Sequence, residues 1–184
     1  MVNPKMTLKQ NILRIEKYFM SQELSNEWKY KGNEISDELF EKIVSSGFLG
    51  FVYEITERES GKKYIGKKML VKRTKRKVKS KNGVSRNKIV WKESDWRGYY
   101  GSSPTLMERV SSGKYKYDRE ILLFCNGKAD LMYYEAKYQM DKNVIFDDNY
   151  FNSMLHIRCN GKGITPIEEL QKQNDEIFSL LEDT

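Results

Sequence analysis

Two tyrosines in one predicted hairpin are the first residues whose spacing could serve chemistry. The stretch GFVYEITERESGKKYIGKK, residues 50–68, reads as a strand, a turn at Gly61 and a return strand, with Tyr53 and Tyr64 near the strand ends. Because β-sheets favour Tyr, Val and Ile for packing alone, one interpretation is a pair of half-buried strand tyrosines. The other is that the hairpin directs two phenols into one site.

A basic segment follows the hairpin and carries the excess positive charge of the chain. Lys67 to Lys92 holds twelve Lys or Arg and no Asp or Glu. Because the whole chain has 33 basic and 26 acidic residues, the remainder carries 21 basic against 26 acidic residues. An acidic body with one concentrated basic segment is typical of a polyanion binder, whereas a solvated charge run is the alternative.

Length and composition limit the class of protein. The 184 residues suit one domain with a terminal extension, and 39% apolar content is enough for a core. No run approaches the roughly 20 apolar residues of a membrane helix, and the charged N-terminus has no signal-peptide core. Cys125 and Cys159 lack metal-ligand spacing and His156 is the one histidine, so we expect free thiols, no His-metal site and a cytoplasmic protein.

The elements that must position these residues follow from periodicity and turn signals. Residues 1–47 contain helical spacing over 6–24, two short extended pieces and a helix between Ser36 and Gly47, which we interpret as an accessory extension. Residues 48–160 predict the hairpin, a projecting two-stranded arm within 67–92 that turns at Asn82-Gly83, a helix, a strand, a second helix and an extended segment. A capping box at Thr165–Glu168 opens a C-terminal amphipathic helix within 161–184. The order β-β-arm-α-β-α-β-α predicts an α+β domain.

The motifs together resemble the GIY-YIG nuclease superfamily. They are VY and YIG eleven residues apart, Glu135 within YYEAKYQ and Asn152 within YFN, and YIGKK followed by SDWRGYYGSS is similar to phage-type members. The resemblance covers Gly47–Arg158 in the correct order. It implies a three-stranded antiparallel sheet flanked by helices, and a Mg²⁺-dependent (or Mn²⁺-dependent) endonuclease of the phage or mobile-element kind, including homing endonucleases. If the protein is phage-encoded, the expected location is the host cell cytoplasm.

The resemblance also implies a role for each motif residue. Glu135 would hold the metal, Tyr53 would accept a proton from the attacking water, Tyr64 would orient water or phosphate, and Asn152 would brace the site. Lys67 and Lys68 would favour a phenolate, since a free phenol has a pKa of about 10. An exposed helix Glu, ordinary strand tyrosines and a turn Asn are the alternatives.

Two departures from the family pattern affect the catalytic prediction. Phe51-Val52 stand where the family has a single residue between Gly and Tyr, and the basic arm occupies the place of the helix that carries the family's catalytic Arg. Lys68, Arg73 or Arg97 could supply that cation, and we favour Lys68 and Arg97 because they flank the arm. Lys does not replace Arg in two-point contact with a phosphate.

Double-stranded DNA is the predicted partner, bound by a monomer or a weak homodimer. A catalytically inactive nucleic-acid-binding module of the same fold is the alternative function, and an interaction subunit that uses residues 1–47 and the last helix is a third. The predicted DNA contacts lie on the arm and in the loop after it: Lys67, Lys72, Arg73, Lys75, Arg76, Lys77, Lys79, Lys81, Arg86, Lys88, Tyr100 and Ser102.

Overall fold

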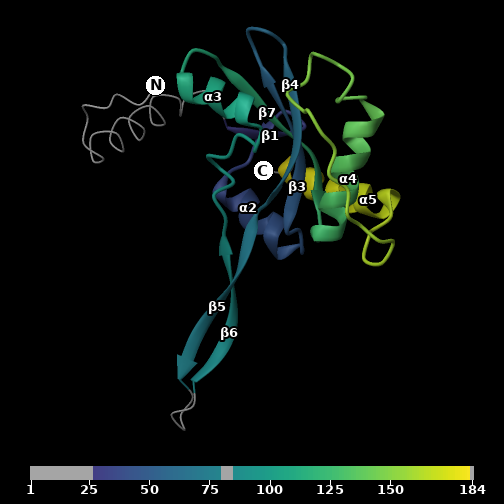
Figure 1. The fold of residues 1–184 in the computed structure, drawn as a ribbon. Helices are drawn as coiled ribbons and strands as arrows, with labels where there is room; N and C mark the ends of the chain where they lie inside the picture. The colour runs from purple at the N-terminus through teal and green to yellow at the C-terminus, as the bar shows by residue number, and fades with distance from the viewer. Residues whose placement is uncertain (1–26, 80–84, 183–184) are drawn as a thin grey trace, which may run out of the picture.

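The structure, a computed structural model, describes residues 27–79 and 85–182 (Figure 1). The helix predicted over residues 6–24, the turn at Asn82-Gly83 and Lys81 lie outside the described residues. The elements are β1 (Trp28–Tyr30), β2 (Asn33–Glu34), α2 (Asp37–Ser45), β3 (Gly50–Glu57), β4 (Lys63–Met69), β5 (Val71–Lys79), β6 (Ser85–Glu93), α3 (Pro104–Ser112), β7 (Tyr117–Cys125), α4 (Lys128–Asp141) and α5 (Ile167–Glu182).

The α+β class is confirmed, but the prediction of a three-stranded sheet is wrong. The main sheet has five strands in the order β2-β1-β7-β3-β4. The expected antiparallel part is β7-β3-β4, and β1 extends it by pairing in parallel with β7. The two extra strands come from residues 28–34, whose buried Trp28 and Tyr30 join the core of the hairpin.

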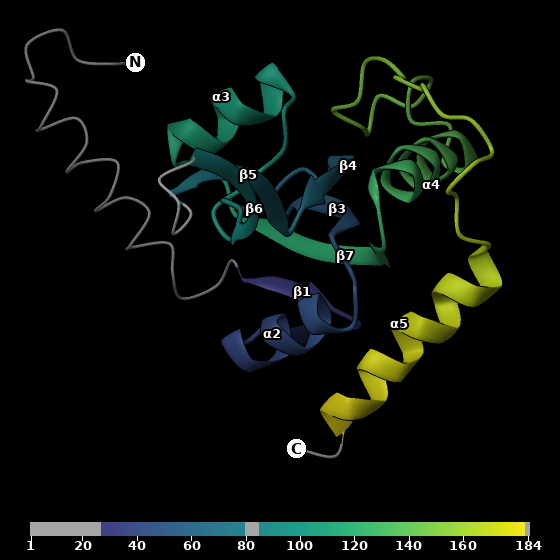
Figure 2. The same cartoon turned by 90° about the horizontal axis from the view of Figure 1, so that it is seen from below.

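Helices cover both faces of this sheet. In Figure 2, α4 lies on one side of the sheet and α2 and α3 lie on the other. On the α2 side, the Trp28 ring lies 5.0 Å from the rings of both Phe51 and Tyr53, and its Nε1 donates to the Trp96 carbonyl at 2.7 Å. Residues 28–45 therefore share one core with the hairpin.

The sequence signals for the ends of α2 and α3 are confirmed. Ser36 caps α2 by accepting from the Leu39 N–H at 3.2 Å. Pro104 begins α3, and Gly113 ends it in the left-handed conformation with φ of 68°, a conformation that favours glycine.

The extended segment predicted after α4 forms no strand. Within described residues 142–166, it makes one isolated bridge between Lys63 and Tyr150 at the edge of β4. Farther along β4, the side-chain amide of Asn152 forms hydrogen bonds with both the N–H and the carbonyl group of Ile65. A side chain thus takes the place of a backbone ladder, so the pairing stops.

The projecting arm is confirmed. Strands β5 and β6 form a separate antiparallel pair that extends away from the body (Figure 1). The root of the arm is anchored by Ser94, whose N–H donates to the Leu70 carbonyl at 2.8 Å and whose hydroxyl donates to the Met69 carbonyl at 2.5 Å. The arm therefore continues directly from β4.

Candidate active site

The hairpin brings the two phenols together. Tyr53 on β3 and Tyr64 on β4 extend from the same sheet face, with ring centroids 6.2 Å apart. Glycine makes the space for them, because a Cβ at Gly66 would lie 2.7 Å from Tyr53 Cζ and 2.8 Å from Tyr64 Cε1, and closer still to Tyr53 Oη. Gly101, with φ of +98°, closes the other side, where a Cβ would lie 2.8 Å from Tyr64 Cε1.

A hydroxyl group and a further aromatic ring pack around the two phenols. The Tyr64 and Ser102 hydroxyls lie 3.2 Å apart, and the Tyr99 ring lies edge-on to the Tyr53 ring with centroids 6.2 Å apart. Tyr53 is only 1% exposed, and burial raises its pKa well above the ordinary 10. Tyr53 is therefore a neutral phenol inside the protein, and Tyr64 is the tyrosine of the pair that lines the adjoining cavity.

A cavity of about 450 Å³ opens at β4, the edge strand of the sheet. Because β4 has no neighbouring strand on that side, groups from both sheet faces reach the cavity around its edge. The lining residues are Tyr64, Lys67, Ser102, Ser103, Pro104, Glu135, Gln139, Phe151, Asn152, Ser153, Met154 and His156.

Glu135 enters the cavity from α4. Its side chain is 12% exposed and forms an ion pair with Lys67 Nζ. Helix α4 is held in place at its start by Asp130, which accepts from the N–H of Asn126 and from the N–H and hydroxyl of Thr165. Glu135 therefore lies on a fixed helix face, beside a cation from the edge strand.

Asn152 and Gln139 secure the backbone of the edge strand. Asn152 Oδ1 accepts from the Ile65 N–H at 2.9 Å, and its Nδ2 donates to the Ile65 carbonyl at 2.8 Å. Gln139 Nε2 donates to the same carbonyl at 2.9 Å. Sequence reasoning missed Gln139, although a polar residue four positions after Glu135 lies on the same helix face.

Some predicted catalytic and DNA-binding residues lie outside the cavity. Lys68 Nζ lies 3.5 Å from the centroid of the Tyr99 ring and 3.2 Å from Asp95, while Arg97 pairs with Asp37 at 2.6 Å and Glu93 at 3.0 Å. Tyr100 is only 7% exposed, and its ring lies 5.8 Å from that of Tyr117. Strand alternation places Lys67 on the α4 face, where it lines the cavity beside Glu135, and Lys68 on the opposite face, where Tyr99 and Asp95 hold its ammonium group.

The oxygen donors that line the cavity fit a hard divalent cation. Within residues 27–79 and 85–182, no group of three His, Cys, Asp or Glu side chains could hold an ion, and Glu135 is the cavity's single carboxylate. The neighbouring hydroxyls of Tyr64 and Ser102 are also hard oxygen donors. Such a site suits Mg²⁺ or Mn²⁺, because Mg²⁺ keeps several waters and needs only one or two carboxylates.

The other predicted DNA contacts separate by position. Lys67 and Ser102 line the cavity, whereas Lys72, Arg73, Lys75, Arg76, Lys77, Arg86 and Lys88 are exposed on the arm. Lys79 ends β5. No helix in the described part of the chain has the length and apolar character needed to cross a membrane.

Comparison with known proteins identifies one family. Residues 28–155 match the family model described as "Putative endonuclease segE, GIY-YIG domain". The match begins at Trp28, where β1 begins, and ends after the segment that contains Asn152. No curated protein and no solved structure matches the chain.

Proposed function

Because the chain belongs to the segE-type GIY-YIG endonuclease family, we propose that it is a metal-dependent endonuclease that hydrolyses phosphodiester bonds in duplex DNA, of the phage or mobile-element kind. The observation that carries the proposal is the cavity at β4. Tyr64 and Lys67 from the edge strand, Glu135 from α4 and Asn152 from the following loop line the same space. A phenol, a cation and a carboxylate are the groups that phosphodiester hydrolysis needs.

Glu135 is the residue that would hold Mg²⁺ or Mn²⁺. When bound, such an ion polarises a phosphoryl oxygen and lowers the pKa of a coordinated water. In the structure the Glu135 carboxylate is paired with Lys67, so its charge is already balanced inside a cavity that excludes most solvent from it.

Lys67 is our candidate for the cation that contacts the phosphate, in place of Lys68 and Arg97. Its Nζ lies at the cavity beside Glu135, and its side chain is 34% exposed. The Lys68 ammonium instead lies over the Tyr99 ring, and Arg97 is bound to two carboxylates away from the cavity. Lys67 can thus exchange Glu135 for a phosphate oxygen with a small side-chain movement.

Tyr64 is our candidate for the phenol that contacts the attacking water. Its hydroxyl borders the cavity and is supported by Ser102 at 3.2 Å. Tyr53, the residue favoured by the resemblance, lies behind it with a raised pKa, so burial opposes its phenolate. Tyr53 would instead position Tyr64 by ring packing, while Asn152 and Gln139 keep the edge strand in place.

The test is cleavage of supercoiled plasmid in Mg²⁺ and in EDTA. We expect nicks or breaks in Mg²⁺ alone, and a loss of at least about 10²-fold in Glu135→Gln and Lys67→Met, the usual scale for removing one catalytic group. Lys68→Met is the matched control, one residue away on the other sheet face, and should stay within about tenfold of wild type. Cleavage that persists in EDTA, or a fully active Glu135→Gln protein, would refute the proposal.

A non-catalytic DNA-binding module is the second candidate, favoured by the pairing of Glu135 with Lys67. If that ion pair is permanent, no metal enters. This function predicts DNA binding that falls with salt concentration, is insensitive to EDTA and is never accompanied by cleavage.

A further inference from the structure

The arm exposes both of its faces, which the fold itself does not explain. After Val71, every described side chain on β5 and β6 is exposed or half-buried, including Trp91 at 50% and Ile89 at 44%. An isolated two-stranded ribbon is at best marginally stable in water, and exposed large apolar side chains mark contact surfaces. The ribbon therefore has the properties of a surface that a partner covers.

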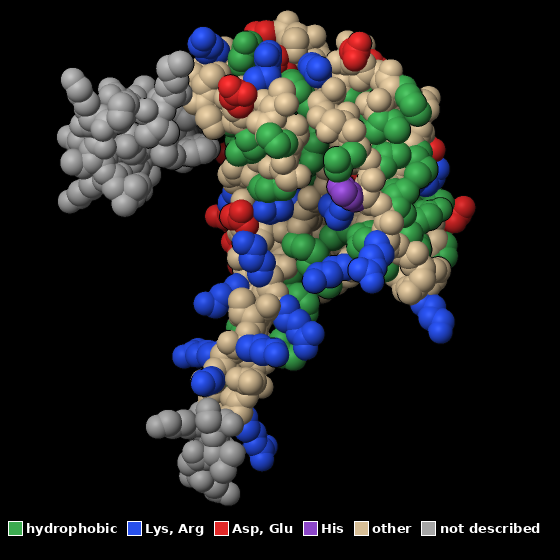
Figure 3. Space-filling view, in the orientation of Figure 1, with side chains coloured by type: hydrophobic (Ala, Val, Ile, Leu, Met, Phe, Trp, Pro, Cys, Tyr) green, Lys and Arg blue, Asp and Glu red, His purple; other side chains and the backbone are tan. Residues whose placement is uncertain are grey.

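The positive charges of the arm indicate a polyanionic partner. The strand register places Lys72 opposite Lys92 and Arg76 opposite Lys88. Like charges directly opposite one another destabilise a strand pair, and a polyanion removes this cost. Figure 3 shows Lys and Arg side chains (blue) along the length of the arm.

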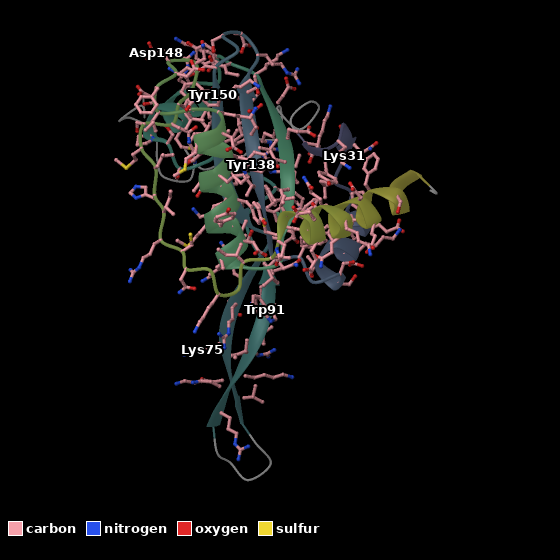
Figure 4. All side chains as sticks on the ribbon, turned by 90° about the vertical axis from the view of Figure 1, so that its right-hand side faces the viewer. Lys31, Lys75, Trp91, Tyr138, Asp148 and Tyr150 are labelled. Carbon is pink, nitrogen blue, oxygen red and sulfur yellow. The ribbon has the colours of Figure 1, made fainter. Side chains whose placement is uncertain are left out.

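The two faces of the ribbon carry different chemistry, because directly paired residues share a face. One face, the Trp91 face, holds Arg73, Lys75, Lys77, Asn87, Ile89 and Trp91. The other, the Lys88 face, holds Lys72, Thr74, Arg76, Val78, Arg86, Lys88, Val90 and Lys92. Trp91 and Lys75 project from the ribbon between the body and the tip of the arm (Figure 4).

The dimensions of the ribbon favour the major groove of B-form DNA. Strands of nine residues extend about 30 Å, and two paired strands lie about 4.8 Å apart. The major groove of B-form DNA, about 12 Å wide, admits a two-stranded ribbon, whereas its minor groove is about 6 Å wide. The major groove of A-form RNA is too deep and narrow for protein side chains to read.

We propose that the arm binds in the major groove of B-form DNA, with the Trp91 face toward the base edges and the cations of the Lys88 face reaching the flanking phosphates. This inference rests on the proposed DNA substrate. Arg pairs well with guanine, Asn with adenine and apolar groups with the thymine methyl group, and the Trp91 face offers all three types. Besides Lys72, which pairs with Asp95, the Lys88 face offers four Lys or Arg side chains.

Binding by the arm would determine which phosphodiester reaches the cavity. Lys67, which lines the cavity, and Val71, which begins the arm, are four residues apart on continuous chain. The Lys72–Asp95 ion pair at 2.5 Å and the Ser94 hydrogen bonds fix the root of the arm to the body. The position of the ribbon in the groove therefore fixes the offset between the recognised bases and the cut.

The test measures binding in EDTA by fluorescence anisotropy, with a labelled 30-base-pair DNA duplex of mixed sequence and an A·T-rich centre. Glucosylated 5-hydroxymethylcytosine in place of cytosine fills the major groove, and netropsin fills the minor groove. We expect at least tenfold weaker binding to the glucosylated duplex and less than a twofold effect of netropsin. The reverse pattern, or equal affinity for an RNA duplex of the same sequence, would overturn the proposal.

Two neighbouring substitutions test which face contacts the bases. Replacing thymine by uracil in the DNA duplex removes only the 5-methyl group, and we expect wild-type protein to bind the uracil duplex about threefold more weakly. Ile89→Ser should abolish this preference, whereas Val90→Ser, one residue along on the other face, should keep it. Lys88→Ala should weaken binding to both duplexes equally and lower the salt slope by about one. If Val90→Ser rather than Ile89→Ser removes the preference, the assigned orientation is wrong.

Failure of this inference is distinguishable from failure of the endonuclease proposal. The binding measurements contain no metal and no cleavage step. Major-groove sensitivity without Mg²⁺-dependent cleavage would refute only the endonuclease. Cleavage without major-groove sensitivity would refute only the role of the arm.

Discussion

Gly66→Ala tests whether the close contact of the two tyrosines with the edge strand builds the site. The new Cβ would lie 2.7 Å from Tyr53 Cζ and 2.8 Å from Tyr64 Cε1. Tyr53 cannot turn aside, because Trp28, Phe51 and Tyr99 surround its ring with centroids 5.0 to 6.2 Å away. Strand β4 must therefore shift outward, and overpacking of this kind costs about 1–3 kcal/mol.

We expect Gly66→Ala to lower the free energy of unfolding by about 2 kcal/mol, which lowers Tm by about 4–8 °C for a chain of this size. Plasmid cleavage should fall by about 10²-fold, because small displacements of catalytic groups have effects of that size. The assays are thermal unfolding followed by circular dichroism, and cleavage at a temperature at which both proteins are folded.

Gly98→Ala is the matched control, since a Cβ at Gly98 has no atom within 4 Å, and its Tm should be unchanged. Adding Tyr53→Phe to Gly66→Ala removes the closest clashing atom and should recover part of the lost stability. If Gly66→Ala has wild-type Tm and activity, the packing of the phenols against β4 does not define the site.

Three further predictions concern stability. Asn152→Ala removes both side-chain hydrogen bonds to Ile65 and should lower the free energy of unfolding by about 1–3 kcal/mol; a urea titration that shows less than about 0.5 kcal/mol would contradict this. Arg109→Ala leaves the fully buried Glu57 carboxylate without its two-point partner at 2.5 and 2.7 Å, so we expect a loss of about 3 kcal/mol. Because Arg109 lowers the pKa of Glu57, the stability that this ion pair gives to wild type should also decrease as pH falls below the ordinary Glu pKa near 4.5. Unfolding measurements of both proteins over a series of pH values check this. Because the pKa of Tyr53 is raised in the folded protein, its contribution to the free energy of unfolding is complete below the pKa of an unfolded tyrosine, near 10, and is lost as pH rises above that value. Tyr53→Phe should therefore show a smaller decrease in Tm between pH 9 and 11 than wild type.

The site illustrates how an edge strand can gather groups from two faces of a sheet. Tyr64 approaches from the face covered by α2 and α3, and Glu135 approaches from the face covered by α4. The cavity lies where β4 has no neighbouring strand, and Asn152 supplies the missing backbone partners for Ile65. An unpaired edge normally invites association with another chain, so this arrangement protects the edge while leaving it open to substrate.

Local patterns in the sequence were sufficient for much of this description. The hairpin, the arm, the caps of α2 and α3, the helix that carries Glu135 and the family itself were all predictable, because turn residues, caps and side-chain periodicity act over a few neighbouring residues. The concentration of Lys and Arg between Lys67 and Lys92 also predicted, without any tertiary information, that the arm binds a polyanion.

Tertiary structure alone decided the strand count and which cation lies beside Glu135. The pairing of Trp28 with Arg119 joins residues that are far apart in the chain, and no local signal specifies a parallel partner. Lys67 and Lys68 are chemically identical neighbours, but side chains alternate along a strand, so the face covered by α4 determines which of them meets Glu135. Arg97 and Tyr100 were predicted from their neighbours in the sequence, whereas Asp37 on α2 and Tyr117 on β7 come from other segments and hold them outside the cavity.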